Sequence, residues 1–445
     1  MTKIRFVILS FVCGCISIGY AQHIQKITLQ SAVAMGVENS TQLMTSHAKL
    51  TEAQAKVREA QDRFLPDVGV SGSYLRVNTP NIKMSKPSDN SSGSNNGPSS
   101  SPLSSFSNLH SLGLLQVTAS EPLFNGFKLR HNKTMTKYLE EAARYDVETT
   151  KSAVALNTMK AVYQYYELLE TRKVVEENLK QAEQRAEEFR NLEKNGVLPR
   201  NDRLRAELQA NSIELGLTEV NNNVQMAEYN LIILLGLPED TQVVLDTNGM
   251  FEVSENSTWE EYLQQGLENR NELKSVAYKV KASEMNYKMV KADRLPSLGL
   301  SAGLVNAYLP NVVTINNALN AGLSLRYSIT GALHASHKMR EVRAQMDQVD
   351  AAQKEIGNNI RMEIKQNFLK YRQMQDKLEI TDRAIAQAQE NFTICENKYK
   401  NGLLLLSDYL DANTLLLESK LNYATTHADV MVAYYELQQS IGNLK

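Results

Sequence analysis

The chain has 445 residues, with 48 lysines and arginines against 50 aspartates and glutamates, and 42% of its residues are hydrophobic. This near-neutral balance excludes a basic surface for nucleic acid, and three cysteines are too few for a disulfide-rich scaffold. A mean hydropathy of -0.37, with no uninterrupted apolar run of about 18 residues beyond the N-terminus, excludes a polytopic helical membrane protein. Length alone predicts about three domains.

The first 21 residues are typical of a secretory signal peptide. A basic start precedes an apolar stretch at 6–18, and small residues stand at Gly19 and Ala21. We expect cleavage after Ala21, which leaves Cys395 as the only cysteine of the mature chain. The alternative is a lipoprotein that carries its lipid on Cys15.

The rest of the sequence contains an internal repeat of two copies. The segment around Gly36 matches the segment around Gly266, and the Asn-Gly pair at 195–196 matches the pair at 401–402. A repeat of about 200 residues is typical of domain duplication. The sequence therefore predicts a first repeat, an inter-repeat segment and a second repeat, at 22–237, 238–259 and 260–445.

Long stretches without proline predict long helices, since proline breaks helix interiors. Apolar residues recur about every 3.5 residues from Met339 to Leu378, which is the coiled-coil period. We expect a helix about 100 Å long at 332–400 and a similar one at 127–194. Each begins after a shorter opening helix and turns at an Asn-Gly pair into a return helix. The opening helices are expected at 31–64 and 260–294, and the return helices at 198–236 and 403–442.

Between the opening helix and the long helix, apolar and polar residues alternate in each repeat. The pattern predicts four strands, at 67–78, 110–120, 297–308 and 319–329. Their length of about 10–12 residues matches membrane β-strands, although one face of a soluble sheet is the alternative. Four strands cannot close a barrel, and lipid does not tolerate open edges, so we expect other copies of the chain to close it as a dimer or trimer.

These motifs, in this order and in duplicate, resemble the TolC family of outer-membrane efflux channels over nearly all of the mature chain. They include a Leu-Pro pair before each strand pair, the segment 122–126 (PLFNG), and the two Asn-Gly turns, each followed by an aspartate. The resemblance implies a fold that is mainly α with a membrane β-barrel. Three copies would form a barrel of about 12 strands and a periplasmic tunnel of coiled-coil α-helical hairpins, with a belt built from 238–259 and the termini.

The resemblance also implies a function and partners. The chain would be the outer-membrane component of a tripartite efflux pump, a passive exit duct that reaches into the periplasm. It would bind a periplasmic adaptor protein and, through it, an inner-membrane pump. Type I protein secretion is an alternative use of the same duct. A periplasmic coiled-coil adaptor is the alternative of another class, disfavoured by two hairpins per chain and by the strand pairs.

Two sets of site residues follow from the resemblance. Adaptor docking is expected at the hairpin turns, at Gly196, Val197, Leu198 and Asp202 and at Gly402, Leu403, Leu404 and Asp408. A closed-state gate is expected at Tyr399, Asp408 and Asp411, although Leu404 occupies the family's arginine position. The alternatives are that the leucines pack only within their own chain, and that Asp408 caps the return helix. Arg205 is a candidate replacement partner for Asp411.

Nothing in the sequence predicts an enzyme, a cofactor or a metal site. Residues 299–303 match G-x-S-x-G, but this serine lies in an alternating strand instead of a strand–turn–helix elbow. His334 and His337 share a helix face without a cluster of further ligands. Trp259 is expected to serve packing.

Overall fold

The computed structural model describes residues 23–76, 111–251, 253, 257–310 and 313–444. The expected signal peptide and the whole loop between the first two strands lie outside these residues. The described chain forms two compact units. The first unit holds the described residues of 1–41, 151–266 and 363–445, and the second holds those of 42–150 and 267–362.

The long helices are α3 (Lys128–Lys194) and α7 (Ile329–Lys400), and each contributes residues to both units. Their return helices are α4 (Arg200–Leu235) and α8 (Leu406–Ser440). The predicted coiled-coil seam of α7 is present, because Val342, Ile360, Ile364 and Tyr371 are all buried. No helix among the described residues combines the length and the apolar character needed to cross a membrane.

The opening helices are each divided, so the prediction of a single helix in each repeat was wrong. They are α1 (Leu29–Glu38) with α2 (Thr41–Asp62), and α5 (Trp259–Asn269) with α6 (Asn271–Lys291), followed by the 3-10 turn η2 (Ala292–Arg294). Both breaks fall directly after a Glu-Asn pair. In the first, the Asn39 amide donates to the carbonyl oxygens of Met35 and Leu235, at 3.0 and 2.8 Å. A contact with a distant helix therefore ends α1.

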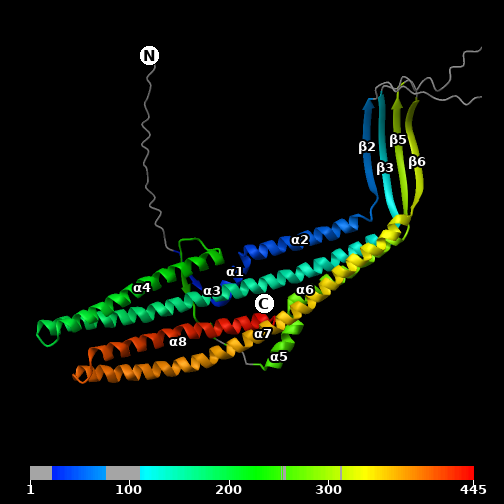
Figure 1. Cartoon of the computed structure of the whole chain (residues 1–445). Helices are drawn as coiled ribbons and strands as arrows, with labels where there is room; N and C mark the ends of the chain where they lie inside the picture. Colours follow the sequence, from blue (N-terminus) through cyan, green and yellow to red (C-terminus); the bar gives the residue numbers. More distant parts are fainter. Residues whose placement is uncertain (1–22, 77–110, 252, 254–256, 311–312, 445) are drawn as a thin grey trace, which may run out of the picture. The chain divides into compact units, whose positions relative to one another are not determined.

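The second unit contains one antiparallel sheet with the strand order β2-β3-β5-β6 (Figure 1). The strands are β2 (Asp67–Arg76), β3 (Ser111–Asn125), β5 (Ser297–Leu309) and β6 (Val313–Arg326). Three expected strand bounds were wrong, one of them the end of β6, which lies at Arg326 instead of 329. The strand β3 continues past Pro122, because the register shifts between Pro122 and Phe124 and a bulge accommodates the proline. The strand β6 starts at Val313, where a loop was expected.

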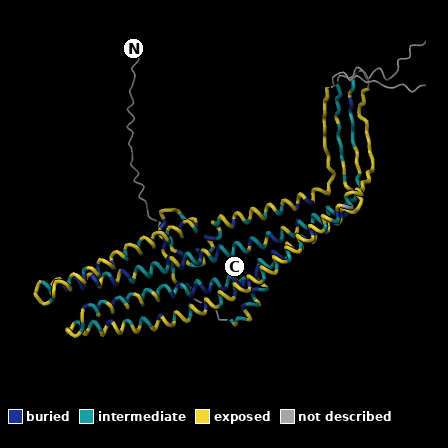
Figure 2. Tube along the Cα trace, viewed as in Figure 1, coloured by how far each residue is buried: buried dark blue, intermediate teal, exposed yellow. Residues whose placement is uncertain are grey.

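Both outer strands of this sheet are exposed along their whole length, as Figure 2 shows. The exposed side chains include large apolar ones on each edge strand. They are Val68, Val70 and Tyr74 on β2, and Leu319, Leu323 and Leu325 on β6. The edges of the sheet and much of its apolar surface therefore have no cover within the described chain.

In the first unit, four helix segments lie side by side in the order α4–α3–α8–α7 (Figure 1). Ion pairs join each neighbouring pair: Arg203 with Glu193, Lys160 with Glu436 and Lys370 with Glu436. A short parallel sheet that the sequence did not predict joins β1 (His23–Ile27) to β4 (Thr241–Leu245). We call β1, β4, α1, α5 and the helix stretches they contact the belt.

Candidate functional site

The candidate site lies at the ends of the two helical hairpins of the first unit, which we call the tips. The two turns have the same backbone. Gly196 and Gly402 have φ angles of 71 and 70°, and the residue after each donates a 2.9 Å hydrogen bond to a carbonyl five positions earlier. This is a helix end with a left-handed residue, which glycine adopts without a Cβ clash. No atom lies within 4 Å of the place where a Cβ would sit on either glycine.

The apolar residues after the turns divide into exposed and packed ones. Val197, Leu403 and Leu405 have exposed fractions of 70, 76 and 71%. Leu198 and Leu404, in contrast, pack against a buried cluster. The alternative that the leucines pack only within their own chain is therefore wrong for Leu403 and Leu405, which with Val197 are the exposed apolar residues that we call the apolar tip surface.

The buried cluster, which we call the tip cluster, joins all four helices. It consists of Ala186, Phe189, Ala206, Phe392, Leu406, Tyr409 and Leu416. Its aromatic rings continue to Tyr399, whose ring stacks on Tyr409 at 5.2 Å with an interplanar angle of 7°. Tyr409 also stacks on Phe392 at 5.6 Å, and Phe189 lies 5.8 Å from Tyr399. Aromatic rings therefore connect α3, α7 and α8 near the turns.

Arg185 belongs to this site although the sequence did not point to it. Its side chain is buried, with the guanidinium 4.5 Å from the centroid of the Tyr409 ring. Within the described chain its Nη1 atom has no hydrogen-bond partner. Burial raises the pKa of Tyr409, and the positive charge of Arg185 opposes this rise. From the sequence, a single arginine within a long polar helix is expected to be exposed to solvent. Only the folded structure shows that the Arg185 side chain is buried.

The structure brings Tyr399 together with Asp202 of the other hairpin. Burial raises the pKa of the Tyr399 hydroxyl, and the negative charge of Asp202 raises it further. Asp408 and Asp411 are both exposed and lie one turn apart on α8. The helix cap is Leu405, without a side-chain hydrogen bond, so the interpretation of Asp408 as the cap was wrong. Among the described residues, no ion pair links Arg205 to Asp411.

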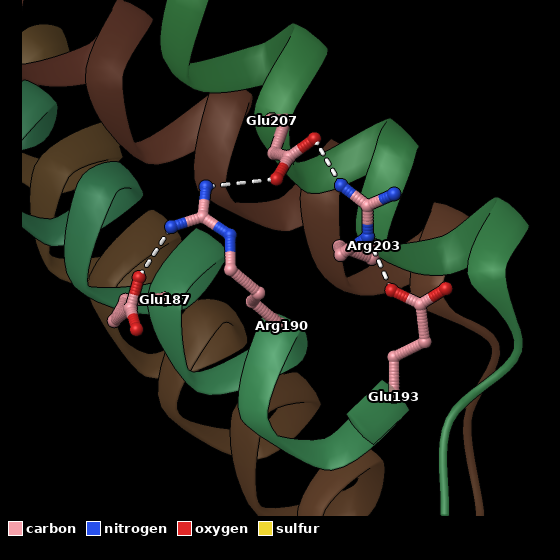
Figure 3. Close-up of polar contacts among 5 residues, drawn as sticks. All are labelled: Glu187, Arg190, Glu193, Arg203 and Glu207. Carbon is pink, nitrogen blue, oxygen red and sulfur yellow. Dashed lines mark hydrogen bonds and ion pairs between the residues drawn. The ribbon is translucent and has the colours of Figure 1, made fainter. Parts of the chain in front are cut away.

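A network of five charged residues fastens α3 to α4 near the first turn (Figure 3). Arg190 pairs with Glu187 and Glu207 at 2.5 and 2.9 Å, while Arg203 pairs with Glu193 and, at 2.6 Å, with Glu207. Hydrogen bonds from Arg190 and then Arg203 lower the pKa of Glu207. The first hairpin is thus fastened by charges near its turn, and the second by stacked rings.

The sequence features that imitate catalytic or metal sites are structural. Ser301 lies within β5, with its hydroxyl 3.4 Å from the carbonyl oxygen of Gly322. His337 contacts Arg340 at 3.1 Å. Throughout the part of the chain that the structure describes, no three His, Cys, Asp or Glu residues form a group that could hold a metal ion.

Comparison with known proteins places this architecture among outer-membrane channels. A family model described as "Outer membrane efflux protein" matches residues 35–237 and 262–443. The chain is 18% identical to the outer membrane protein VceC from Vibrio cholerae, with a TM-score of 0.74 and coverage of 93% of this chain and 96% of that one. No curated protein sequence matches.

Two further solved structures are similar. One is the CmeC outer membrane channel of Campylobacter jejuni, at 16% identity and a TM-score of 0.73, covering 93% of this chain and 85% of that one. The other is the open state of the MtrE outer membrane channel of Neisseria gonorrhoeae, at 15% identity and a TM-score of 0.73, covering 94% and 89%. At these identities the likeness shows the fold, and it confirms the predicted fold class.

Proposed function

Because the chain belongs to the outer membrane efflux protein family, we propose that it is the exit duct of a tripartite efflux pump for small molecules. Three copies would form a channel in the outer membrane with a tunnel reaching into the periplasm. The observation that carries this proposal is the exposed four-stranded sheet. Its edge strands β2 and β6 need partners, and its apolar side chains suit lipid.

The exposed side of α4 supports assembly of several copies. Six large side chains on this helix are exposed: Leu204, Leu208, Leu215, Met226, Tyr229 and Ile233. Their successive spacings of four, seven, eleven, three and four residues are sums of the three- and four-residue steps of a coiled-coil seam, separate from the seam that α4 presents to its own unit. Since α4 is an outer helix of the first unit, this second seam would pack on the next protomer.

Docking of a periplasmic adaptor would use the apolar tip surface of Val197, Leu403 and Leu405, with the inner-membrane pump reached through the adaptor. An exposed apolar surface beside a solvent-facing turn favours a protein partner. The same tips would contain the gate, since Tyr399, Asp408 and Asp411 lie next to the docking surface. The family arginine is replaced by Leu404, so the gate would depend on carboxylates and stacked rings.

Gly402→Trp is expected to abolish adaptor crosslinking while trimers persist. The indole would project from a position with no neighbour within 4 Å and so block docking, and the left-handed backbone at Gly402 adds strain that the control variant shares. Gly402→Asn is the matched control, because asparagine tolerates the left-handed conformation and adds little bulk. Crosslinking of an adaptor to the detergent-purified channel measures the effect. Wild-type crosslinking by the tryptophan variant would contradict the docking surface.

The double variant Asp408→Ala/Asp411→Ala is expected to raise single-channel conductance in planar bilayers several-fold. Each protomer would present two carboxylates to the tunnel axis, where they hold the narrow mouth through bound cations. Glu418→Ala is the control, since it removes an exposed carboxylate from the same face of α8 two turns away. An unchanged conductance of the double variant would contradict the gate. The absence of conductance in every protein, including wild type, would contradict the channel itself.

A further inference from the structure

A pocket of about 530 Å³ lies in the belt between the start of α5 and one side of α7. Its walls are largely aromatic. Phe368 lies 5.8 Å from Trp259 and 6.0 Å from Tyr262, measured between ring centroids. Two cationic side chains, Lys365 and Arg372, complete the rim. Lys365, Phe368 and Arg372 stand on the face of α7 opposite Lys370, which pairs with Glu436 of α8, so this part of the pocket lies on the outer side of the four-helix row.

The two cations of this pocket are not neutralised within the described chain. The Lys365 ammonium lies 4.3 Å from the centroid of Trp259, and the Arg372 guanidinium lies 5.9 Å from that of Phe368. Neither forms an ion pair with a described carboxylate, including Glu260, the one carboxylate of the pocket lining. Cations held on ring faces keep their remaining donors free, so the pocket suits a partner with negative charges.

The contacts of Glu436 fix the height of the pocket along the helices. This carboxylate pairs with Lys160 of α3 at 2.5 Å and with Lys370 of α7 at 2.7 Å. The two lysines therefore lie at the same position along the helix axes, which we call the same height. On the other side of α3, the Tyr165 hydroxyl donates to the Val243 carbonyl oxygen at 3.1 Å. Five residues of α3 span about 8 Å. The strand β4 therefore lies at nearly the same height as the pocket, on the opposite edge of the unit.

The turn that leads from α4 into β4 carries unpaired negative charge. Glu239 and Asp240 are both exposed, and among the described residues neither has an ion pair. In a ring of copies whose axis runs along the helices, the α7 edge of one protomer meets the α4 edge of the next. Because the protomers are related by rotation about that axis, each residue lies at the same height along the axis in every protomer. The acidic turn of one protomer and the cationic pocket of its neighbour are then level.

We infer that the belt pocket receives the turn at 238–240 of the neighbouring protomer, with Glu239 and Asp240 paired to Lys365 and Arg372. This inference rests on the proposed trimer and adds its specific contact. The aromatic walls exclude water from the ion pairs, which strengthens them. Each protomer contributes one pocket and one acidic turn, so the contact repeats around the ring and closes the belt.

The test joins Asp240→Cys with Arg372→Cys in a Cys395→Ser background and treats the purified protein with a short bismaleimide. Covalent dimers and trimers on denaturing gels support the contact. The matched control pairs Asp240→Cys with Glu390→Cys, which is exposed on the same face of α7 but about 27 Å away. It is expected to remain monomeric on those gels.

Native mass measurement separates the two ways in which the test can fail. Intact trimers without crosslinks in the Asp240/Arg372 pair overturn this contact and leave the proposed duct standing. Monomers in native measurement overturn the trimer and the contact together. As a second measure, Arg372→Glu is expected to lower the temperature at which trimers dissociate, and Asp240→Arg in the same chain is expected to restore it. A double variant no more stable than Arg372→Glu alone overturns the pairing.

Discussion

Replacing Gly266 by leucine is expected to push α5 away from α7 and to destabilise the belt by about 1–3 kcal/mol, the usual cost of overpacking a core. A Cβ at this position would collide with the Cδ1 atom of Ile364, which is fully buried, and would lie 3.5 Å from the Cα atom of Ile441. The side chain of Ile364 cannot move aside without opening the seam of α7. The loss would appear in thermal unfolding of the detergent-purified protein, followed by its helical circular dichroism.

A second glycine provides the control for this experiment. Gly357 also lies inside a helix, but no atom lies within 4 Å of its Cβ position. Gly357→Leu is therefore expected to keep or raise stability, since leucine has the higher helix propensity by about 0.5–1 kcal/mol. Equal unfolding temperatures for Gly266→Leu and wild type would show that the close contact between α5 and α7 does not limit the packing.

Replacing Tyr409 by alanine is expected to destabilise the tips by about 3–5 kcal/mol, the range measured when large aromatic residues are removed from cores. Tyr409 is buried and touches Phe392, Tyr399 and Arg185 at once. Its loss would leave a cavity between the two hairpins and a buried guanidinium without its ring. Amide hydrogen exchange over 388–400 is expected to accelerate, because this end of α7 would open more often.

Tyr409→Phe separates the ring from the hydroxyl in the same measurement. Phenylalanine keeps every ring contact and removes one hydroxyl, so its effect is expected to stay near 1 kcal/mol. If Tyr409→Ala exchanged no faster than wild type at the tips, the stacked rings would not be what holds the second hairpin closed.

Much of the fold follows from local sequence rules. The long helices could be predicted because proline is absent and apolar residues repeat with the coiled-coil period over many turns. The strands could be predicted from alternation. The family resemblance, now confirmed by the family match, also sets aside the alternative of a periplasmic coiled-coil adaptor. These features succeed because each depends on residues that are near one another in the chain.

The features that were missed depend on distant residues. At the break after α1 the Asn39 amide donates to the carbonyl oxygen of Leu235, 196 residues away, a contact that the sequence could not predict. The strands β1 and β4 have five residues each and pair only with one another, with nearly the whole of the first repeat between them. The burial of Arg185 likewise requires the second hairpin to be in place. Such contacts have no period that a sequence pattern could reveal.

The two tips share the hydrogen bonds of their turns, yet charged side chains hold the first and aromatic rings hold the second. The peptide path at the two turns is the same while the side chains around it differ. The two hairpins thus respond differently to their surroundings. Salt screens the ion pairs that join α3 to α4 in the first hairpin, whereas the stacked rings that join α7 to α8 in the second carry no charge for salt to screen.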